Sequence, residues 1–203
     1  MFVHLTTHSA YSLQEGLLLP SELAQAALAN GMRALGLTDH RLLSGTVEFA
    51  IACKRAGIQP VLGLEIDLEI SNKLALMAMS LEGWSNLCRL SSALALRPEP
   101  EAACPLDLLA DYTEGLIALS DEQGDSSGRR LGQLKELFPE RLYVTLQEPS
   151  VGMQVASLSR KLRLPLVATA PVYYLAAEQA TLVLTLAAIL CASPLSIDSR
   201  RDR

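Results

Sequence analysis

Three polar residues stand where apolar, strand-like runs of the sequence end, and their side chains are of kinds that bind metal ions. His8 and His40 each follow such a run, and Glu65 lies in another. In α/β proteins the chemistry gathers where strands end. Imidazole and carboxylate groups that converge on one point are typical ligands of zinc or manganese. The pattern therefore indicates the framework of a metal site.

The composition favours one globular domain that does not hold nucleic acid by itself. Half of the 203 residues are apolar and 19% are charged, so the chain can bury a substantial core. Its 17 basic and 22 acidic residues give a net charge of −5, and the lysines and arginines form no large cluster. A chain of this charge holds a phosphate backbone poorly. We therefore expect no strong nucleic-acid binding by the chain alone.

No segment predicts export or insertion into a membrane. The N-terminus lacks the basic region and apolar stretch of a secretory signal, and the widely spaced cysteines predict reduced core thiols, so the expected location is cytoplasmic. The most hydrophobic segment, residues 180–192, is shorter than the roughly 20 residues that a bilayer requires. Apolar residues surround this predicted helix, so we expect it to dock on a partner or on a second copy in a homodimer.

Apolar runs alternate with helical patterns along the whole chain, which favours βα units around a largely parallel sheet or barrel. The predicted strands are Phe2–Leu5, Ala34–Leu37, Val61–Leu68, Leu74–Met79, Leu116–Leu119, Leu142–Leu146 and Leu166–Thr169. The predicted helices are Pro20–Asn30, Leu43–Ala56, Trp84–Ala95, Arg129–Phe138, Val151–Leu162 and Ala176–Cys191. We expect a single domain over residues 1–203, with residues 196–203 as a flexible tail or the start of a linker.

Several motifs in order along the chain resemble one protein family. They are His8-Ser9-x-Tyr11-Ser12-Leu13-x-Glu15-Gly16, Leu37-Thr38-Asp39-His40, Gly63-x-Glu65, Glu82-Gly83-Trp84-x-Asn86-Leu87, Gly115-Leu116-Ile117-Ala118-Leu119-Ser120 and Leu164-Pro165-Leu166-Val167-Ala168-Thr169. This series resembles the PHP (polymerase and histidinol phosphatase) domain, above all the N-terminal PHP domain of bacterial DNA polymerase III alpha subunits. The resemblance implies a distorted, seven-stranded (β/α) barrel, similar to a TIM barrel, in agreement with the seven predicted strands. In active members of the family, a cluster of zinc or manganese ions at the barrel mouth supplies a hydroxide that attacks a phosphoester.

The resemblance carries over four metal-ligand positions and shows five that have lost their ligand. The retained positions are His8, Glu15, His40 and Glu65. The lost positions are Thr6, Asp121, Pro149, Pro171 and Tyr173. Four ligands could hold one ion weakly but no cluster, so we expect no bound cofactor, with zinc or manganese as the alternative. Leaving these groups buried without partners would cost roughly 1–3 kcal/mol each, so we expect them to bond one another.

The candidate residues also have structural interpretations. His8 and His40 can be two hydrogen-bonded histidines at the barrel mouth, and His4 is expected to make a structural hydrogen bond. Asp39 is expected to orient its neighbours or to cap the following helix; the alternative is a catalytic role together with His40. Glu15 can be a solvated loop carboxylate as readily as a ligand.

The resemblance implies a degenerate PHP domain without catalytic activity, in the alpha subunit of a bacterial replicative DNA polymerase. Its expected role is structural, packing on the polymerase body and lying near a proofreading exonuclease subunit. The alternative is a metal-dependent phosphoesterase or 3′–5′ exonuclease with a reduced metal site. Bound zinc or manganese in stoichiometric amount would favour the alternative.

Overall fold

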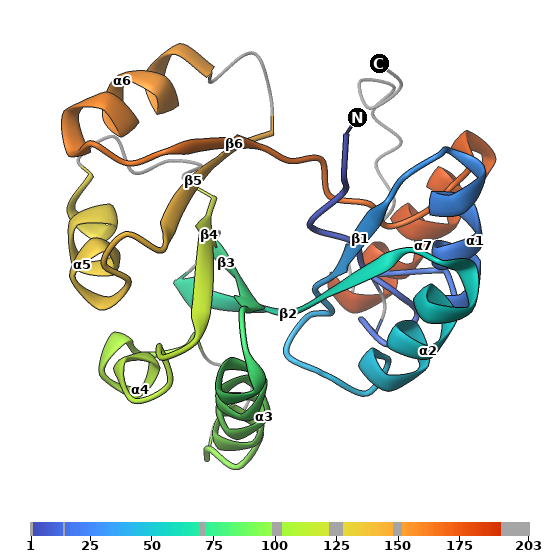
Figure 1. Cartoon of the computed structure of the whole chain (residues 1–203), viewed down its shortest axis with the longest axis horizontal. Helices are drawn as coiled ribbons and strands as arrows, with labels where there is room; N and C mark the ends of the chain where they lie inside the picture. The colour runs from blue at the N-terminus through green and yellow to red at the C-terminus, as the bar shows by residue number, and fades with distance from the viewer. Residues whose placement is uncertain are drawn as a thin grey trace.

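A single curled sheet forms half of a barrel and organises the chain (Figure 1). The computed structural model describes residues 2–13, 15–69, 72–98, 103–121, 128–147 and 152–191. The six strands lie side by side in the order of the sequence. They are β1 (Ala34–Leu37), β2 (Gln59–Glu69), β3 (Asn72–Ala78), β4 (Leu116–Ser120), β5 (Leu142–Leu146) and β6 (Leu166–Ala168). Strands β2, β3 and β4 pair antiparallel, and the other neighbouring pairs are parallel.

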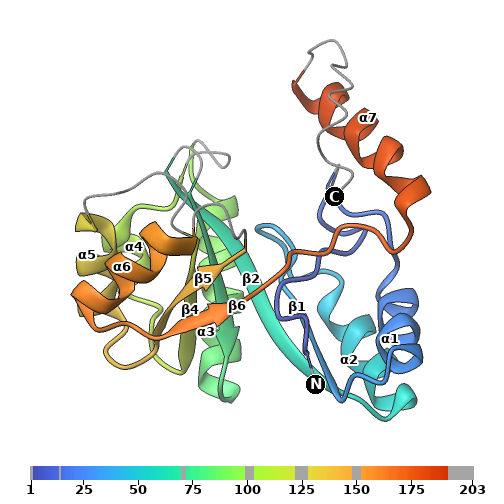
Figure 2. The ribbon, with the colours of Figure 1, turned by 90° about the horizontal axis from the view of Figure 1, so that it is seen from above.

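Helices cover the outer side of the sheet in two groups (Figures 1 and 2). The elements are α1 (Pro20–Ala29), α2 (Thr46–Ala56), α3 (Leu81–Ala95), α4 (Leu106–Ala110), α5 (Arg129–Leu137), α6 (Gly152–Leu162), the 3-10 helix η2 (Ala177–Gln179) and α7 (Ala180–Cys191). Helices α1 and α2 enclose a small core with β1 around Phe49 and Leu37. Helices α3 to α6 enclose a larger core against β2 to β5. The two cores meet along β2, the long strand that joins both halves of the sheet.

The side chains of β2 alternate between this core and the opposite face. Leu64, Ile66 and Leu68 are buried in the larger core. Because successive side chains of a strand point to opposite faces, Glu65 and Asp67 lie on the other face, which is the inner side of the half-barrel. The two carboxylates, Glu65 and Asp67, therefore lie on the inner face of a strand whose outer face is apolar.

Six of the seven predicted strands are present among the described residues, and the seven-stranded barrel is not confirmed. Residues 2–5 make no strand ladder. Residues 4–8 bond to both neighbouring segments at isolated points: the amides of Gly36 and Thr38 donate to the carbonyls of His4 at 2.8 Å and Thr7 at 2.9 Å, and Thr7 forms an isolated parallel bridge with Val172. The segment therefore lies between β1 and the chain after β6, where a seventh strand would stand, without the repeated pairing that defines one.

Other differences are local. The second helix begins at Thr46, not Leu43, because Gly45 occupies the N-cap position. The short helix α4 was not predicted, since five residues beside prolines carry too little periodicity. The predicted tail, residues 196–203, lies outside the described residues. None of the helices that the structure describes is both long and apolar enough to cross a membrane.

Candidate functional site

Two adjacent strands and the loop after β1 place charged side chains at the mouth of the half-barrel. Asp67 on β2 pairs directly with Lys73 on β3, so their side chains share the inner face. Glu65 lies one pleat further along the same face. His40 follows β1 and forms a parallel bridge with Glu65, in which the Glu65 amide donates to the carbonyl of Asp39 at 3.1 Å. Backbone pairing thus fixes the spacing of the site.

Asp39 holds the N-terminal loop against β1. Its carboxylate accepts hydrogen bonds from the Ser9 amide at 2.6 Å, the Ser9 hydroxyl at 2.7 Å and the Ser12 hydroxyl at 2.8 Å. Asp39 is 1% exposed, so these bonds compensate for its burial. No side chain caps helix α2. Of the two structural roles expected for Asp39, the structure therefore shows the orienting one and not the helix cap.

His40 uses both ring nitrogens to bind carboxylates. Its Nδ1 lies 2.9 Å from Glu15 Oε1, and its Nε2 lies 2.8 Å from Asp67 Oδ2. Burial alone would lower the pKa of His40, but the hydrogen bonds with Asp67 and Glu15 and their negative charges raise it to about 9. His40 is therefore an imidazolium at neutral pH, with a proton on each nitrogen.

The carboxylates around His40 are stabilised in their charged form. Burial would raise the pKa of Glu15 and of Asp67, but in Glu15 the hydrogen bond with His40 and the charge of Lys73 lower it to about 2. In Asp67 the His40 bond and the Arg41 guanidinium, whose Nη2 lies 3.0 Å from Oδ2, also lower the pKa to about 2. Both groups are thus anions over the physiological range.

Lys73 reaches between Glu15 and Glu65. Its Nζ lies 2.7 Å from Glu65 Oε1 and 3.5 Å from Glu15 Oε2. Burial opposes the charge of Lys73, but the negative charge of Glu65 outweighs it and raises the pKa of the ammonium. Burial would raise the pKa of Glu65, but its neighbours His8 and Lys73 lower it and so favour the charged carboxylate. Lys73 and Glu65 thus form a short, charge-assisted hydrogen bond that is partly shielded from solvent.

His8 is wholly buried beside this pair. Its ring stacks on that of Tyr173, with centroids 4.5 Å apart, and its Nδ1 lies 3.3 Å from the Ser12 hydroxyl oxygen. Because Ser12 gives its proton to Asp39, it can only accept from His8, which places a proton on Nδ1. Nε2 has no hydrogen-bond partner and lies 3.6 Å from Glu65 Oε2. Nε2 therefore faces the Glu65 carboxylate at a distance too long for a hydrogen bond.

All four retained positions, His8, Glu15, His40 and Glu65, are brought together, and they bond one another or their neighbours, as expected. Among the lost positions, Tyr173 stacks on His8, and the Asp121 amide donates to the carbonyl of Lys73 at 3.3 Å. Pro171 precedes the bridge with Thr7. Pro149 lies outside the described residues.

At Thr6, another of the lost positions, the hydroxyl oxygen is buried without a hydrogen-bond partner among the described residues. His4 behaves as predicted, because its Nδ1 lies 3.2 Å from the carbonyl oxygen of Ala170.

Three charged residues of the site were not predicted from the sequence, namely Arg41, Asp67 and Lys73. A signal for two of them was available: apolar and charged residues alternate along Leu64–Leu68, and Leu74 and Leu76 alternate with Lys73 and Ala75. A hairpin between these runs sets Asp67 opposite Lys73. Arg41 could not be found this way, since it acts from a loop with a backbone φ of 60°.

A metal cluster of the kind that the resemblance implies does not fit these residues. Both ring nitrogens of His40 are already bonded to carboxylates, at 2.9 Å and 2.8 Å, so neither is free for an ion. The carboxylates of Glu15, Glu65 and Asp67 are already neutralised by the cations of His40, Arg41 and Lys73, three charges against three. Only one group of potential ligands, His8, Glu15 and Glu65, converges within 4.8 Å among the described residues.

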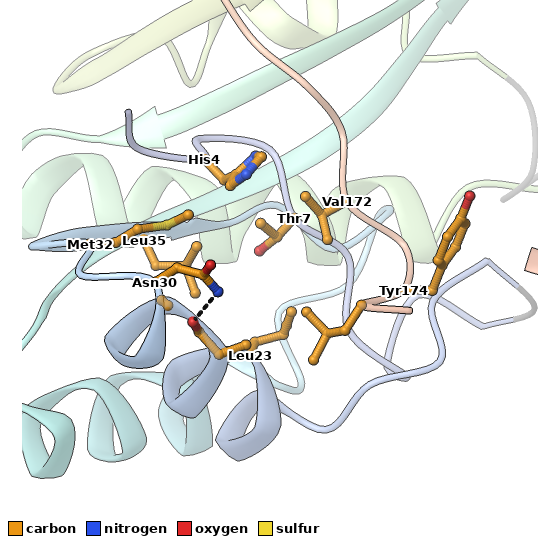
Figure 3. A pocket seen from close by; sticks show the side chains of 11 residues that line it. His4, Thr7, Leu23, Asn30, Met32, Leu35, Val172 and Tyr174 are labelled. Atoms are coloured by element: carbon orange, nitrogen blue, oxygen red, sulfur yellow. Dashed lines mark hydrogen bonds between the residues drawn. The ribbon is translucent and has the colours of Figure 1, made fainter. Parts of the chain in front are cut away.

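A separate cavity of about 250 Å³ lies between α1, the N-terminal segment and the chain after β6 (Figure 3). Leu23, Leu35 and Val172 line it with apolar surface, and His4 and Asn30 stand at its edge. The Asn30 side chain is engaged with the carbonyl of Ala26 at 2.8 Å. This cavity offers no converging ligand set, so the charged mouth of the half-barrel is the candidate site.

A family model described as "PHP domain" matches residues 4–149. The chain is 36% identical to an error-prone DNA polymerase of Symbiobacterium thermophilum over 88% of its length, and 32% identical to the DNA polymerase III subunit alpha of Caulobacter vibrioides over 85%. It spans only 20% and 18% of these relatives, respectively.

Solved structures share the fold at low sequence identity. An amidohydrolase from Chromobacterium violaceum superposes with a TM-score of 0.59 and 15% identity, over 84% of this chain and 87% of that one. A Bifidobacterium adolescentis protein described as a metal-dependent phosphoesterase gives a TM-score of 0.58 and 11% identity, over 82% and 86%. At such identities the likeness concerns the fold alone.

Proposed function

The chain belongs to the PHP domain family, and on that premise we propose that it is a non-catalytic PHP domain of a bacterial DNA polymerase of the DNA polymerase III alpha type. Its role is structural: it packs on the polymerase body and provides a surface near which a proofreading exonuclease subunit docks. The relatives that it matches are polymerases about five times its length, which supports a role inside a larger protein.

One observation carries the non-catalytic part of the proposal, namely the position of His40 between Glu15 and Asp67. With its two ring nitrogens bonded to carboxylates at 2.9 and 2.8 Å, this histidine has no nitrogen left to ligate a metal or to accept a proton from water. Asp39, the alternative catalytic partner, already accepts three hydrogen bonds from Ser9 and Ser12. The residues that would do chemistry are therefore engaged in holding the loops together.

The docking part rests on helix α7. Figure 2 shows this helix projecting beyond α1 and α2. None of its described side chains is buried, and Leu182 and Ile189 are 57% and 64% exposed. An apolar helix left uncovered is typical of a surface that meets another protein. We propose that α7 contacts the polymerase body; a homodimer through the same helix is the competing arrangement.

The catalytic part is tested by hydrolysis assays on the whole chain. We expect no manganese- or zinc-dependent cleavage of bis-p-nitrophenyl phosphate or of a 3′-labelled oligonucleotide above the buffer rate. Wild type and His40→Ala should give equal traces, which would assign any residual signal to a contaminating enzyme. Turnover that requires manganese and disappears in His40→Ala would instead establish the phosphoesterase alternative.

The docking part is tested by adding the chain to the Symbiobacterium thermophilum polymerase from which the matching N-terminal fifth has been removed. We expect co-elution of the two on gel filtration, and its loss on Leu182→Glu combined with Ile189→Glu. Leu81→Glu is the matched control, because Leu81 is 87% exposed on α3, away from α7. Self-association of the chain alone that the double variant abolishes would replace this partner by a second copy.

A further inference from the structure

Lys73 lies where the surviving ligand positions converge. The nitrogen and oxygen atoms offered by His8, Glu15 and Glu65 lie within 4.8 Å of one another, and the Lys73 ammonium touches both carboxylates, at 2.7 and 3.5 Å. No other described lysine is partly buried; Lys54, Lys135 and Lys161 are all exposed. A cation from the chain itself thus stands among three groups that could each bind an ion.

The second observation that indicates a cation-binding site concerns the buried imidazole of His8. His8 is 0% exposed, and its Nε2 is directed at Glu65 without a hydrogen-bond partner. A buried nitrogen in this state costs free energy, so its orientation requires an explanation. The Ser12 hydroxyl fixes the ring from the other side by accepting from Nδ1, as second-sphere partners do for metal-binding histidines.

We infer that Lys73 acts as a built-in cation in a one-ion site formed by His8, Glu15 and Glu65, so that the ammonium and a divalent ion exclude each other. The ammonium neutralises Glu65 and Glu15, and its contacts are with their carboxylate oxygens, so Nε2 of His8 receives no hydrogen bond from it. Tetrahedral metal–ligand bonds of about 2.0–2.2 Å place the ligand atoms about 3.3–3.6 Å apart. His8 Nε2 and Glu65 Oε2 already lie at 3.6 Å, and the three ligand atoms all lie within 4.8 Å of one another. A small inward movement would complete the site once Lys73 is gone.

The inference concerns the same barrel mouth as the proposed function but goes beyond it, since it assigns Lys73 a role and predicts a binding site in a variant. It does not require catalysis, because three ligands that hold one ion supply no cluster. Binding of one ion by the Lys73 variant without turnover would support the inference and leave the non-catalytic proposal intact. A folded variant without Lys73 that binds no ion would refute the inference alone, whereas metal-dependent turnover by wild type would refute both.

The test is zinc binding to the whole chain, measured by equilibrium dialysis with metal analysis at neutral pH. Wild type and Lys73→Arg, which keeps the charge, should retain no stoichiometric zinc. Lys73→Met keeps the length of the side chain without its charge and should bind one zinc per chain, at least about tenfold more tightly than wild type. Adding His8→Gln to Lys73→Met should abolish that site, and zinc should raise the Tm of Lys73→Met alone.

A measurement on wild type covers the case in which Lys73→Met does not fold. Mass-spectrometric mapping of acetylation by acetic anhydride should find Lys73 the slowest of the lysines, and Glu65→Gln should raise its rate several-fold. Lys54 provides the exposed reference within the same sample. Acetylation of Lys73 as fast as Lys54, a folded Lys73→Met that binds no zinc, or stoichiometric zinc on wild type would each overturn the inference.

Discussion

At the residue scale, the barrel mouth is a network in which every retained ligand has a partner of opposite charge or shares a hydrogen bond. His40 bridges Glu15 and Asp67, Arg41 adds a second cation to Asp67, and Lys73 joins Glu15 to Glu65. Removing one member of such a network leaves the others buried and uncompensated, which costs more than the intact pair contributes. Stability should therefore depend on the charge of single residues.

The first prediction concerns pH and His40. Its pKa is about 9 in the folded chain against 6.5 as the usual value, so its contribution is fully present below pH 6.5 and is lost as the pH rises through 9. We expect His40→Gln to reduce the free energy of unfolding by roughly 1–3 kcal/mol at pH 6 and by much less at pH 9.5. Urea denaturation at both pH values measures this.

His4→Gln serves as the control for that experiment, because the His4 side chain bonds to an uncharged group, the carbonyl of Ala170. A destabilisation by His40→Gln that is the same at both pH values would contradict the charge assignment. Glu15 and Asp67 act in the opposite direction. Their pKa values of about 2 mean that their contribution is present above about pH 4.5 and is lost as the pH falls through 2.

The second prediction compares two threonines in the same region. Thr38 has a buried hydroxyl without a partner among the described residues, whereas the Thr7 hydroxyl donates to the carbonyl of Gly36. Thr38→Val removes an uncompensated polar atom and should leave the free energy of unfolding unchanged or raise it by up to about 1 kcal/mol, while Thr7→Val should lower it by about 1 kcal/mol. Equal losses in the two variants by urea denaturation would be inconsistent with this assignment.

At the scale of elements, the pairing of β2 with β3 and its contact with β1 set the distances in the site. A single register, Asp67 opposite Lys73 and Glu65 opposite Ala75, places three charges on one inner face. If β2 shifted by one residue along β3, Glu65 and Asp67 would turn into the apolar core, so the buried leucines on the other face of β2 enforce the register. The strand pairing and the site are therefore coupled.

The third prediction follows from the close approach of strands at Gly63. A Cβ atom there would lie 2.6 Å from the carbonyl oxygen of Leu76 on β3 and 2.8 Å from Thr38 Cγ2. Gly63→Ala must separate strands and should lower the free energy of unfolding by about 2 kcal/mol or more. Thermal denaturation gives the difference.

Gly132→Ala on α5 is its matched control. No atom lies within 4 Å of the added methyl group, so helix propensity should raise stability by roughly 0.5–1 kcal/mol. If Gly63→Ala melts at the temperature of wild type, the strands at this point are not as tightly packed as the structure describes them.

At the scale of the whole molecule, the net charge and the exposed apolar side chains are consistent with the proposed docking role and do not favour nucleic-acid binding. The net charge is −5, and the cations of the barrel mouth are engaged with carboxylates. The largest exposed apolar side chains of α7 offer protein contacts instead. Both features favour protein partners over a phosphate backbone.

The fourth prediction is accordingly that the chain alone does not bind primer–template DNA with submicromolar affinity at physiological salt. Fluorescence anisotropy with a labelled duplex measures it, and the absence of a basic stripe is the reason for the expectation. A titration at 50 mM and 200 mM salt separates weak nonspecific contact from a specific complex. A salt-sensitive, submicromolar isotherm would show that the charged mouth or another face does engage phosphates.

The sequence by itself determined the family and the order of most strands and helices. Apolar periodicity fixes the elements, and the resemblance to the family singled out His8, Glu15, His40 and Glu65, which the fold brings together. The first predicted strand failed because a strand exists only through repeated pairing with a neighbour, and residues 2–5 find only isolated bonds.

Only the tertiary structure decided which charges neutralise the carboxylates. Lys73 and Asp67 look like ordinary strand residues in the sequence, and Arg41 like a loop residue. Their roles arise when β2 and β3 pair in one register and the loop after β1 turns toward them. Coulomb interactions depend on distances of a few ångströms between groups far apart in sequence, and no local pattern encodes those distances.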